Sequence, residues 1–419
     1  MKNFMVLQFW LLLLSAHPAL GGVVEVGPDG PYPTIRSAIE AAHSGDRIIV
    51  CPGIYREGQI IVDKMVSILG EGQPVLDGEG RSEILTIIAD SVRVSGLVVQ
   101  NVGISYMEDR AGIRVRKAKN FVIEENTLIN TFFGIYLEHA GSGVIRHNKI
   151  RGEAVQENAS GNAIHLWYCR NIRVDQNQVS GHRDGIYLEF VDSSVIANNL
   201  STNNLRYGLH FMFSNGDDYF GNRFSGNGAG VAVMFSKKIN MWENVFEQNW
   251  GRASYGLLLK EIYDAAIYRN TFHENTIGIH LEGCGRIKYS HNDFANNGWA
   301  LKMAGGCLEN TFTENNFVSN TFDLSTDSNT DDNHYDGNYW SEYAGYDLDR
   351  DEVGDVPYHP VKLFSFVVSR TPESIVLLRS VFVDLINFSE KVSPLFTPAN
   401  VADHSPRMKY ISWQEIQLK

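Results

Sequence analysis

The chain has 419 residues, of which 20% are charged, and a formal net charge of -13. This acidic balance argues against nucleic acid as a partner, whereas cations remain acceptable ligands. Its length, its 38 glycines and its low charge content allow one long continuous core without division into independent domains.

The amino terminus has the pattern of an export signal. Lys2 is followed by an apolar run from Phe4 to Leu14 and by small residues up to Gly21. The run is too short to span a bilayer, and this order of residues is typical of a cleaved signal peptide. We predict that residues 1–21 are removed and that the protein works outside the cytoplasm; an uncleaved anchor is the alternative.

An N-terminal cap and the first turns of a repeat are predicted over residues 22–100. Thr34 can cap a short helix with an apolar face between Ile35 and Ala42, and a strand from Arg47 to Cys51 follows. The segment through Tyr55 resembles the amino-terminal cap of pectin-lyase-like β-helix proteins. Such a cap covers strand edges that would otherwise pair with other chains.

The middle of the chain repeats roughly every 22 residues. Each repeat has a Gly-apolar-x-apolar element and, further on, an apolar-x-x-Asn-x-apolar element. The first element, with Ala replacing Gly in two copies, lies at 112–115, 134–137, 163–166, 185–188, 208–211, 230–233, 256–259, 278–281 and 300–303. The second element carries Asn126, Asn148, Asn177, Asn198, Asn222, Asn244, Asn270, Asn292 and Asn315.

This period fits one turn of a coil of short strands, in which alternate residues face inward and outward. We predict an all-β fold, a right-handed parallel β-helix of the pectin-lyase-like solenoid type, over residues 101–345. Inward Ile, Leu, Val and Phe would form its core. Stacked asparagines at a bend can hydrogen-bond to one another, so their column is interpreted as structural and not catalytic.

The outward positions carry the candidate chemistry. The residues two and four after the strand glycine are expected to point outward, which brings His210, Met212 and Met234 together. His210 and Met212 would lie about 7 Å apart along one strand, and Met234 about 4.8 Å away on the next turn. Imidazole with thioether sulfur suits copper(I), so we interpret the three as a copper site. The alternative is that they pack against a loop or partner. Met241 and Met303 fall on inward columns and are predicted core residues.

Two cysteines share a column with small or apolar residues of other turns. Cys169 and Cys284 occupy the same place in their turns, so we predict that both are buried. By residue count, Cys307 lies one residue off this column in the next turn. A disulfide between Cys284 and Cys307 is compatible with export, but burial alone also explains the column, and the sequence leaves the matter open.

Residues 346–360 form a predicted acidic loop. Asp347, Asp349, Asp351 and Asp355 place carboxylates in a glycine-containing stretch, as in a calcium loop, although the glutamate that closes an EF-hand is missing. We predict a structural Ca2+ site at the C-terminal end of the coil. A solvated acidic turn is the alternative.

The repeat stops after Pro360, and residues 361–419 are predicted to form a C-terminal helical docking segment. A helix start at Thr371 leads into an apolar stretch from Ile375 to Phe388. The stretch is too short and too charged to span a membrane, yet too apolar for a free surface helix. It is expected to bury itself against the coil or a partner. In the tail, His404 and Met408 are additional candidate copper ligands.

Several segments resemble the NosD family over essentially the whole mature chain. They are 206–215, 232–238, 255–262, 336–347 and 354–357. The family's His-x-Met motif corresponds to His210 and Met212, its Met-Phe-Ser motif supplies Met234, and its Asp-x-x-Pro pattern is matched by Asp403 and Pro406. The resemblance implies a periplasmic, non-enzymatic β-helix protein that handles copper, as Cu(I) in our interpretation.

The partners follow from the same resemblance. It implies the membrane permease and the ATPase of an ABC transporter, a copper-donor lipoprotein, and nitrous oxide reductase, whose copper centres would be matured for denitrification. The permease would then be the partner of the C-terminal helix. Because a β-helix also serves other functions, two alternatives stay open: a polysaccharide lyase, hydrolase or epimerase, and a carbohydrate-binding scaffold.

Overall fold

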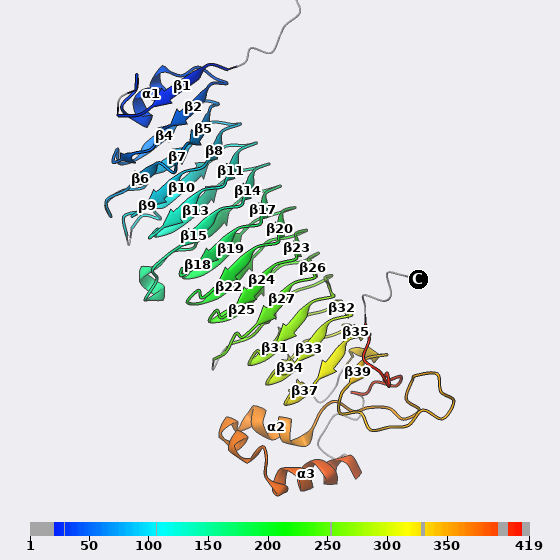
Figure 1. Ribbon diagram of the computed structural model, residues 1–419. Coiled ribbons are helices and arrows are strands. Elements are labelled where there is room, and N and C mark those ends of the chain that lie inside the picture. Colours follow the sequence, from blue (N-terminus) through cyan, green and yellow to red (C-terminus); the bar gives the residue numbers. More distant parts are fainter. Residues whose placement is uncertain are drawn as a thin grey trace, which may run out of the picture.

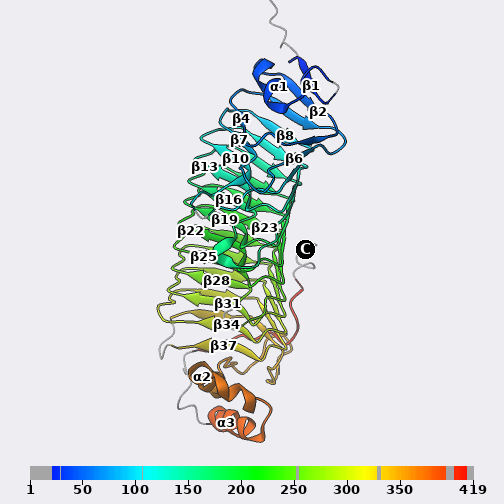
Figure 2. The ribbon, with the colours of Figure 1, turned by 90° about the vertical axis from the view of Figure 1, so that its left-hand side faces the viewer.

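The computed structural model describes residues 21–412, apart from residues 29, 106, 252–253, 328–331 and 393–400. The predicted signal peptide lies outside the described residues. The chain winds into one long coil of short strands, with a small helix at one end and two helices at the other (Figure 1). The side view shows the same elongated stack (Figure 2). The predicted parallel β-helix is confirmed.

Strands in the described part of the chain form three parallel sheets that run the length of the coil. The 14-stranded sheet contains β1 (Val23–Val26), β2 (Arg47–Val50), β5 (Ser67–Gly70), β8 (Arg93–Ser95), β11 (Val122–Glu124), β14 (Val144–Arg146), β17 (Arg173–Asp175), β20 (Val195–Ala197), β23 (Asp218–Phe220), β26 (Asn240–Trp242), β29 (Ala266–Tyr268), β32 (Lys288–Ser290), β35 (Thr311–Thr313) and β38 (His334–Asp336). The 13-stranded sheet contains β3 (Ile54–Tyr55), β6 (Val75–Asp77), β9 (Val98–Gln100), β12 (Thr127–Ile129), β15 (Lys149–Arg151), β18 (Gln178–Ser180), β21 (Leu200–Thr202), β24 (Arg223–Ser225), β27 (Val245–Glu247), β30 (Thr271–His273), β33 (Asp293–Ala295), β36 (Asn316–Val318) and β39 (Tyr339–Trp340). The 12-stranded sheet contains β4 (Ile60–Val62), β7 (Leu85–Ile87), β10 (Ala111–Arg116), β13 (Phe133–Glu138), β16 (Ile164–Trp167), β19 (Asp184–Glu189), β22 (Tyr207–Met212), β25 (Ala229–Met234), β28 (Leu257–Lys260), β31 (Ile277–Glu282), β34 (Trp299–Met303) and β37 (Phe322–Thr326).

The glycine-led elements of the repeat all lie in the 12-stranded sheet, and strict alternation sets the direction of their side chains. In β22, Leu209 and Phe211 are fully buried inside the coil, while His210 and Met212 face outward. Inside the coil, aromatic rings stack from turn to turn, with centroids 4.1–5.5 Å apart. This stack consists of Phe224, Phe246, Phe272, Phe294, Phe317 and Trp340. Each stacked pair contributes about 0.5–1.5 kcal/mol to stability, in addition to the contribution from burying its apolar area.

A ladder of buried asparagines runs along the corner between the 14- and 13-stranded sheets. Its members are Asn126, Asn148, Asn177, Asn199, Asn222, Asn244, Asn270, Asn292, Asn315 and Asn338. At each step the side-chain oxygen accepts from the asparagine one turn before; Asn270 Oδ1, for example, accepts from the backbone N and from Nδ2 of Asn244, both at 3.0 Å. Turn groups that strands cannot pair are satisfied in this way.

The ladder corrects one position of the repeat. The sequence pattern assigns Asn198 to the column, but Asn199 is the ladder residue, and Asn198 instead donates to Asp175 at 3.1 Å. Asn198 has φ of 54°, in the left-handed region that asparagine tolerates, and so it turns the chain just before the ladder. Two adjacent asparagines made the choice ambiguous from the sequence.

A second ladder stacks Asn204, Asn227, Asn249, Asn275, Asn297 and Asn320 at the corner between the 13- and 12-stranded sheets. The longer spacing before β16 is a surface loop that contains the short 3-10 helix η1 (Glu157–Ala159). Insertions therefore leave the stacked corners in register, as the repeat predicts.

The first ladder ends on a carboxylate. The backbone N and Nδ2 of Asn338 donate to Asp403 Oδ2 at 2.9 and 3.0 Å, and Trp340 Nε1 donates to the same oxygen at 3.0 Å. Gly337 N and Ser405 N donate to Oδ1, both at 3.1 Å. Asp403 is fully buried and takes the place that a further asparagine would occupy. The C-terminal tail thus packs against β38 and β39, at the opposite end of the coil from the cap, and this places His404 and Met408 at that end as well.

Helices cover both ends of the coil. At the start, α1 (Ile35–Ala41) buries Ile35, Ala38 and Ile39, and the predicted cap is confirmed, because Thr34 Oγ1 accepts from Ser37 N at 3.1 Å. At the other end, α2 (Leu363–Arg370) packs Phe364 and Val368 against Phe322 of β37. α2 lies within the predicted helical segment 361–419, although the sequence pattern placed the helix start later, at Thr371.

The segment expected to form one helix from Thr371 is divided. It consists of the 3-10 helix η2 (Pro372–Leu377) and the α-helix α3 (Val381–Val392). α3 lies farther from the coil than α2 does (Figure 1). Residues 401–412 return to the coil and are not helical. Among the described residues, no helix has the length and apolar character needed to cross a membrane.

Replacement of Asp403 tests the end of the asparagine ladder. Asp403→Ala leaves several buried donors without an acceptor, so we expect a loss of unfolding free energy on the order of 3 kcal/mol. Asp403→Asn, which keeps one oxygen in place, should lose less. Urea denaturation followed by tryptophan fluorescence measures both. The exposed neighbour change His404→Ala is the control, and equal stability of Asp403→Ala and His404→Ala would contradict this role.

Candidate metal centre

The outward face of β22 and β25 brings two methionines side by side. The register of these strands pairs Met212 with Met234 and His210 with Ala232. Neighbouring strands are about 4.8 Å apart, so the two thioether side chains project from adjacent turns on the same face. Both methionines are half-buried, whereas Met241 and Met303 are buried in the core, as predicted.

His210 faces outward but is buried, because aromatic rings cover it. Its exposed fraction is 5%. The ring of Tyr187, one turn earlier, and the ring of Tyr207, on the same strand, have centroids 4.7 and 4.8 Å from the imidazole. The hydroxyl of Tyr187 donates to Met212 Sδ at 3.8 Å, so one tyrosine contacts both the imidazole and a thioether.

One ring nitrogen of His210 faces a buried ion pair. Arg206 donates to both oxygens of Asp184, from Nε at 3.0 Å and from Nη2 at 2.6 Å. His210 Nδ1 lies 3.7 Å from Asp184 Oδ2 and 3.4 Å from Arg206 Nη2. Burial opposes the charge on Asp184, but its interactions with His210 and Arg206 outweigh this effect and hold the pKa of the carboxyl below its ordinary value.

The other ring nitrogen, Nε2, is buried and has no hydrogen-bond partner within the part of the chain that the structure describes. A buried polar atom without a partner is costly, and such atoms often mark a functional site. Burial lowers the pKa of His210 below its ordinary value, with Asp184 opposing in part, so the imidazole is neutral at pH 7. Arg206 Nη2 donates to Nδ1 when that nitrogen is unprotonated, whereas a proton on Nδ1, toward Asp184 Oδ2, would leave the Nε2 lone pair for a metal ion.

The donor set suits a soft cation. A neutral imidazole and two thioethers carry no formal charge, and sulfur ligands of this kind select copper(I) over hard divalent ions. On the neighbouring turns, register pairs Met212 with Glu189 and Met234 with Lys260. A charged side chain therefore lies on each side of the methionine pair.

Sequence reasoning found His210 and the two methionines but missed Asp184, Arg206 and Tyr207. A signal was present for Asp184. Register pairs it with Tyr207, and its column otherwise contains mostly apolar residues such as Ala229 and Phe133. A single charged residue in an apolar column indicates a buried ion pair.

A groove of about 740 Å³ runs along the same outward face on the N-terminal side of His210. Tyr136, His165 and Trp167 line it, and Glu189 forms its border toward Met212. Two of its carboxylates are already paired with arginines: Glu83 with Arg114 at 2.8 Å, and Glu138 with Arg116 at 3.0 Å.

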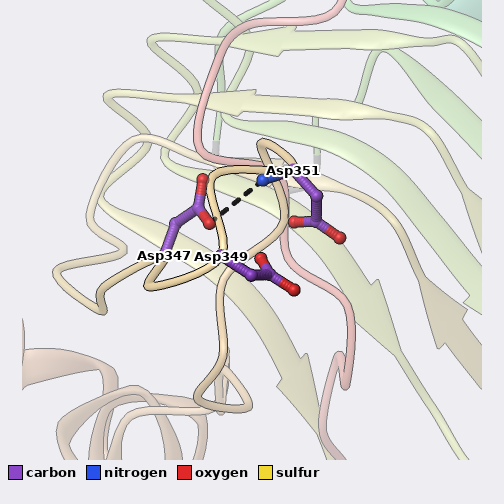
Figure 3. Close-up of side chains that lie close together, drawn as sticks. All are labelled: Asp347, Asp349 and Asp351. Carbon is purple, nitrogen blue, oxygen red and sulfur yellow. Dashed lines mark hydrogen bonds between the residues drawn. The ribbon is translucent and has the colours of Figure 1, made fainter.

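The acidic loop brings together three of the four predicted calcium ligands (Figure 3). Carboxylate oxygens of Asp347, Asp349 and Asp351 lie within 4.8 Å of one another. Asp355 is outside this group, and its Oδ2 accepts from Leu348 N at 2.7 Å. The charge of Asp351 raises the pKa of Asp349, as expected for crowded carboxylates. Asp347 also accepts from backbone N–H groups of the loop, such as that of Arg350 at 2.6 Å.

Comparison of the fold shows enzymes among similar structures. The catalytic unit of a GH87 alpha-1,3-glucanase from Streptomyces thermodiastaticus strain HF3-3 superposes with a TM-score of 0.60 over 78% of this chain and 70% of that chain, at 16% identity. At this identity, the likeness concerns the fold alone.

Sequence comparisons identify the family. Residues 146–345 match the family described as "Periplasmic copper-binding protein (NosD)". The chain is 28% identical to the "Probable ABC transporter binding protein NosD" of Pseudomonas aeruginosa, over 84% of this chain and 86% of that protein. It is 26% identical to the protein of the same name from Stutzerimonas stutzeri, over 84% and 85% of the two chains. The family match and the two relatives of the same name together support assignment of this chain to the NosD family.

Proposed function

We propose that the protein binds copper(I) through His210, Met212 and Met234 and delivers or inserts it during maturation of the copper centres of nitrous oxide reductase. The observation that carries this proposal is the buried, unpartnered Nε2 of His210 on the face where Met212 and Met234 are paired in register. The family's description as copper-binding supports the metal. In this proposal the protein is an accessory protein that handles copper and is not an enzyme.

Asp184 is a positioning residue in this proposal. Its carboxylate is held by Arg206 and lies 3.7 Å from His210 Nδ1, so with a metal on Nε2 it would attract the ring proton to Nδ1. Tyr187 and Tyr207 exclude water from the imidazole, and the half-buried methionines leave an approach for the ion from outside. Copper is cargo here, received from a copper-donor lipoprotein and passed to the reductase.

Copper(I) titration against a competing chelator tests the site. Replacing His210, Met212 and Met234 together by alanine should lower the affinity at least 100-fold, because all three soft donors are removed. The matched control removes the same residue types from exposed positions elsewhere, as His43→Ala, Met65→Ala and Met107→Ala. Equal loss in the two variants, or none in either, would contradict the proposed site.

We further propose that α3 docks on the membrane permease of an ABC transporter, with its ATPase on the other side of the membrane. Both relatives are named as ABC transporter binding proteins. Val383 of α3 faces α2 and is buried, but Phe382 and Phe388 are 59% and 65% exposed. An apolar surface of this kind on a short terminal helix is typical of an interaction site.

The double change Phe382→Asp and Phe388→Asp should abolish co-purification with the permease and ATPase from detergent-solubilised membranes, because it introduces charges into the apolar contact. Copper(I) affinity should stay unchanged, since α3 lies beyond the C-terminal end of the coil, whereas β22 lies near its middle (Figure 2). Ile54→Asp with Val155→Asp changes two exposed apolar residues elsewhere and serves as the control. Retained co-purification of the α3 variant would rule out this docking surface.

We also propose that Asp347, Asp349 and Asp351 hold a structural Ca2+. Three carboxylates within one short loop provide hard oxygen ligands of the kind that calcium prefers. Calorimetric titration with Ca2+ should show binding that Asp349→Asn weakens about tenfold or more, while Asp63→Asn, an exposed acid elsewhere, leaves it unchanged. Absence of heat with the unmodified protein would assign the loop to a solvated acidic turn.

A sugar-active protein is the second candidate, because the groove with Tyr136 and Trp167 resembles a cleft that could hold a polar ligand. We place it second because Glu83 and Glu138 are paired with arginines, and a hydrolase needs a carboxyl group that can give up or take a proton across one bond. Release of shorter or unsaturated sugars from uronate polymers would favour this alternative.

A further inference from the structure

The structure places Cys284 and Cys307 at the same position of two successive turns. Gly285 and Leu308, the residues that follow them, form a parallel β-bridge, and Leu308 N donates to Cys284 O at 3.0 Å. The residue count puts Cys307 one residue off this column, and that expectation is wrong. The extra residue is taken up before Cys307, where Gly306, with φ of 82°, lies over Gly283.

In-register residues of neighbouring turns have Cα atoms about 4.8 Å apart, within the 4.4–6.8 Å range found across disulfides. The two thiols are also close enough for each to shift the pKa of the other. Both cysteines are buried: Cys284 is fully enclosed, and Cys307 is 8% exposed.

We propose that Cys284 and Cys307 form a disulfide bond in the periplasmic protein. The periplasm is an oxidising compartment in which paired cysteines of exported proteins are converted to disulfides. A disulfide is neutral and apolar, so it fits the buried corner without a charge. The inference is independent of the copper site.

The chain contains its own comparison. Cys169 occupies the same column, but its neighbours in the adjacent turns are Ala140 and Val191, so no second thiol lies within reach. Cys51 lies in the first turns, and its thiol donates to Glu25 at 3.3 Å. The geometry therefore assigns oxidation to one pair and leaves the other two cysteines as thiols.

The two sulfurs have different parts in the reaction. Proximity to Cys284 lowers the pKa of Cys307, although burial opposes this, while proximity to Cys307 and burial raise the pKa of Cys284. Cys307 is also the more exposed, so its thiolate attacks first. It bonds to one sulfur of a disulfide-bearing oxidoreductase and releases the other sulfur of that donor as a thiolate.

Cys284 completes the exchange. It loses its proton, attacks Cys307 Sγ in the mixed disulfide, and releases the remaining donor sulfur. The two cysteines thereby lose two protons and two electrons, and the donor disulfide is reduced to a dithiol. The bond links the corner after β31 to the corner after β34, near the end of the coil that carries α2 and α3.

Thiol mapping tests the proposal. The protein is isolated from the periplasm without reductant, quenched in acid, denatured and alkylated with N-ethylmaleimide, and its peptides are identified by mass spectrometry. We expect alkyl groups on Cys51 and Cys169, and on Cys284 and Cys307 only after reduction. The unreduced chain should be lighter than the reduced chain by the mass of two hydrogen atoms.

Serine variants test whether Cys284 is bonded to Cys307 and to no other cysteine. Cys284→Ser should make Cys307 reactive without reductant, while Cys169→Ser should leave the mapping of the pair unchanged. The melting temperature should fall on reduction in the unmodified protein and in Cys169→Ser, but not in the double variant Cys284→Ser with Cys307→Ser. Alkylation of all four cysteines without reductant, or a disulfide that includes Cys51 or Cys169, would overturn the inference.

Discussion

The stacking of equivalent residues, one turn above another, is the constraint on which the rest of the structure depends. The corners of the coil expose backbone groups that no strand can pair, and at two of them buried asparagines satisfy these groups by bonding to one another in columns. Because each asparagine needs its neighbour, the columns hold every turn in register. Loops can then vary in length without moving the side chains on the sheets.

The same constraint builds the candidate metal centre. Register places Met212 beside Met234, and alternation puts His210 on their face. The chemistry is then set by what surrounds the imidazole: two tyrosine rings exclude water, and the ion pair of Asp184 with Arg206 occupies the side of Nδ1. The result is an imidazole whose buried Nε2 has no hydrogen-bond partner among the residues that the structure describes.

The ends of the coil carry a different solution to the same problem. The first ladder needs a final acceptor, and Asp403 provides it from a tail that is remote in sequence. A carboxylate can accept from several donors at once and has none of its own to satisfy, so it terminates a column that an amide would only extend. The helices α2 and α3 then cover the open end, and α3 leaves apolar side chains such as Phe382 and Phe388 exposed.

The sequence by itself determined the parallel β-helix, the core methionines, the helix cap at Thr34 and the shared face of His210, Met212 and Met234. These follow from local periodicity, because alternation and a constant period set both direction and register. Only the tertiary structure decided the burial of His210, the role of Asp184, the end of the ladder at Asp403, the position of Asn199 and the register of Cys307. Each of these depends on contacts between turns, or on where an inserted residue is absorbed, and neither is recorded in the spacing of residues along the chain.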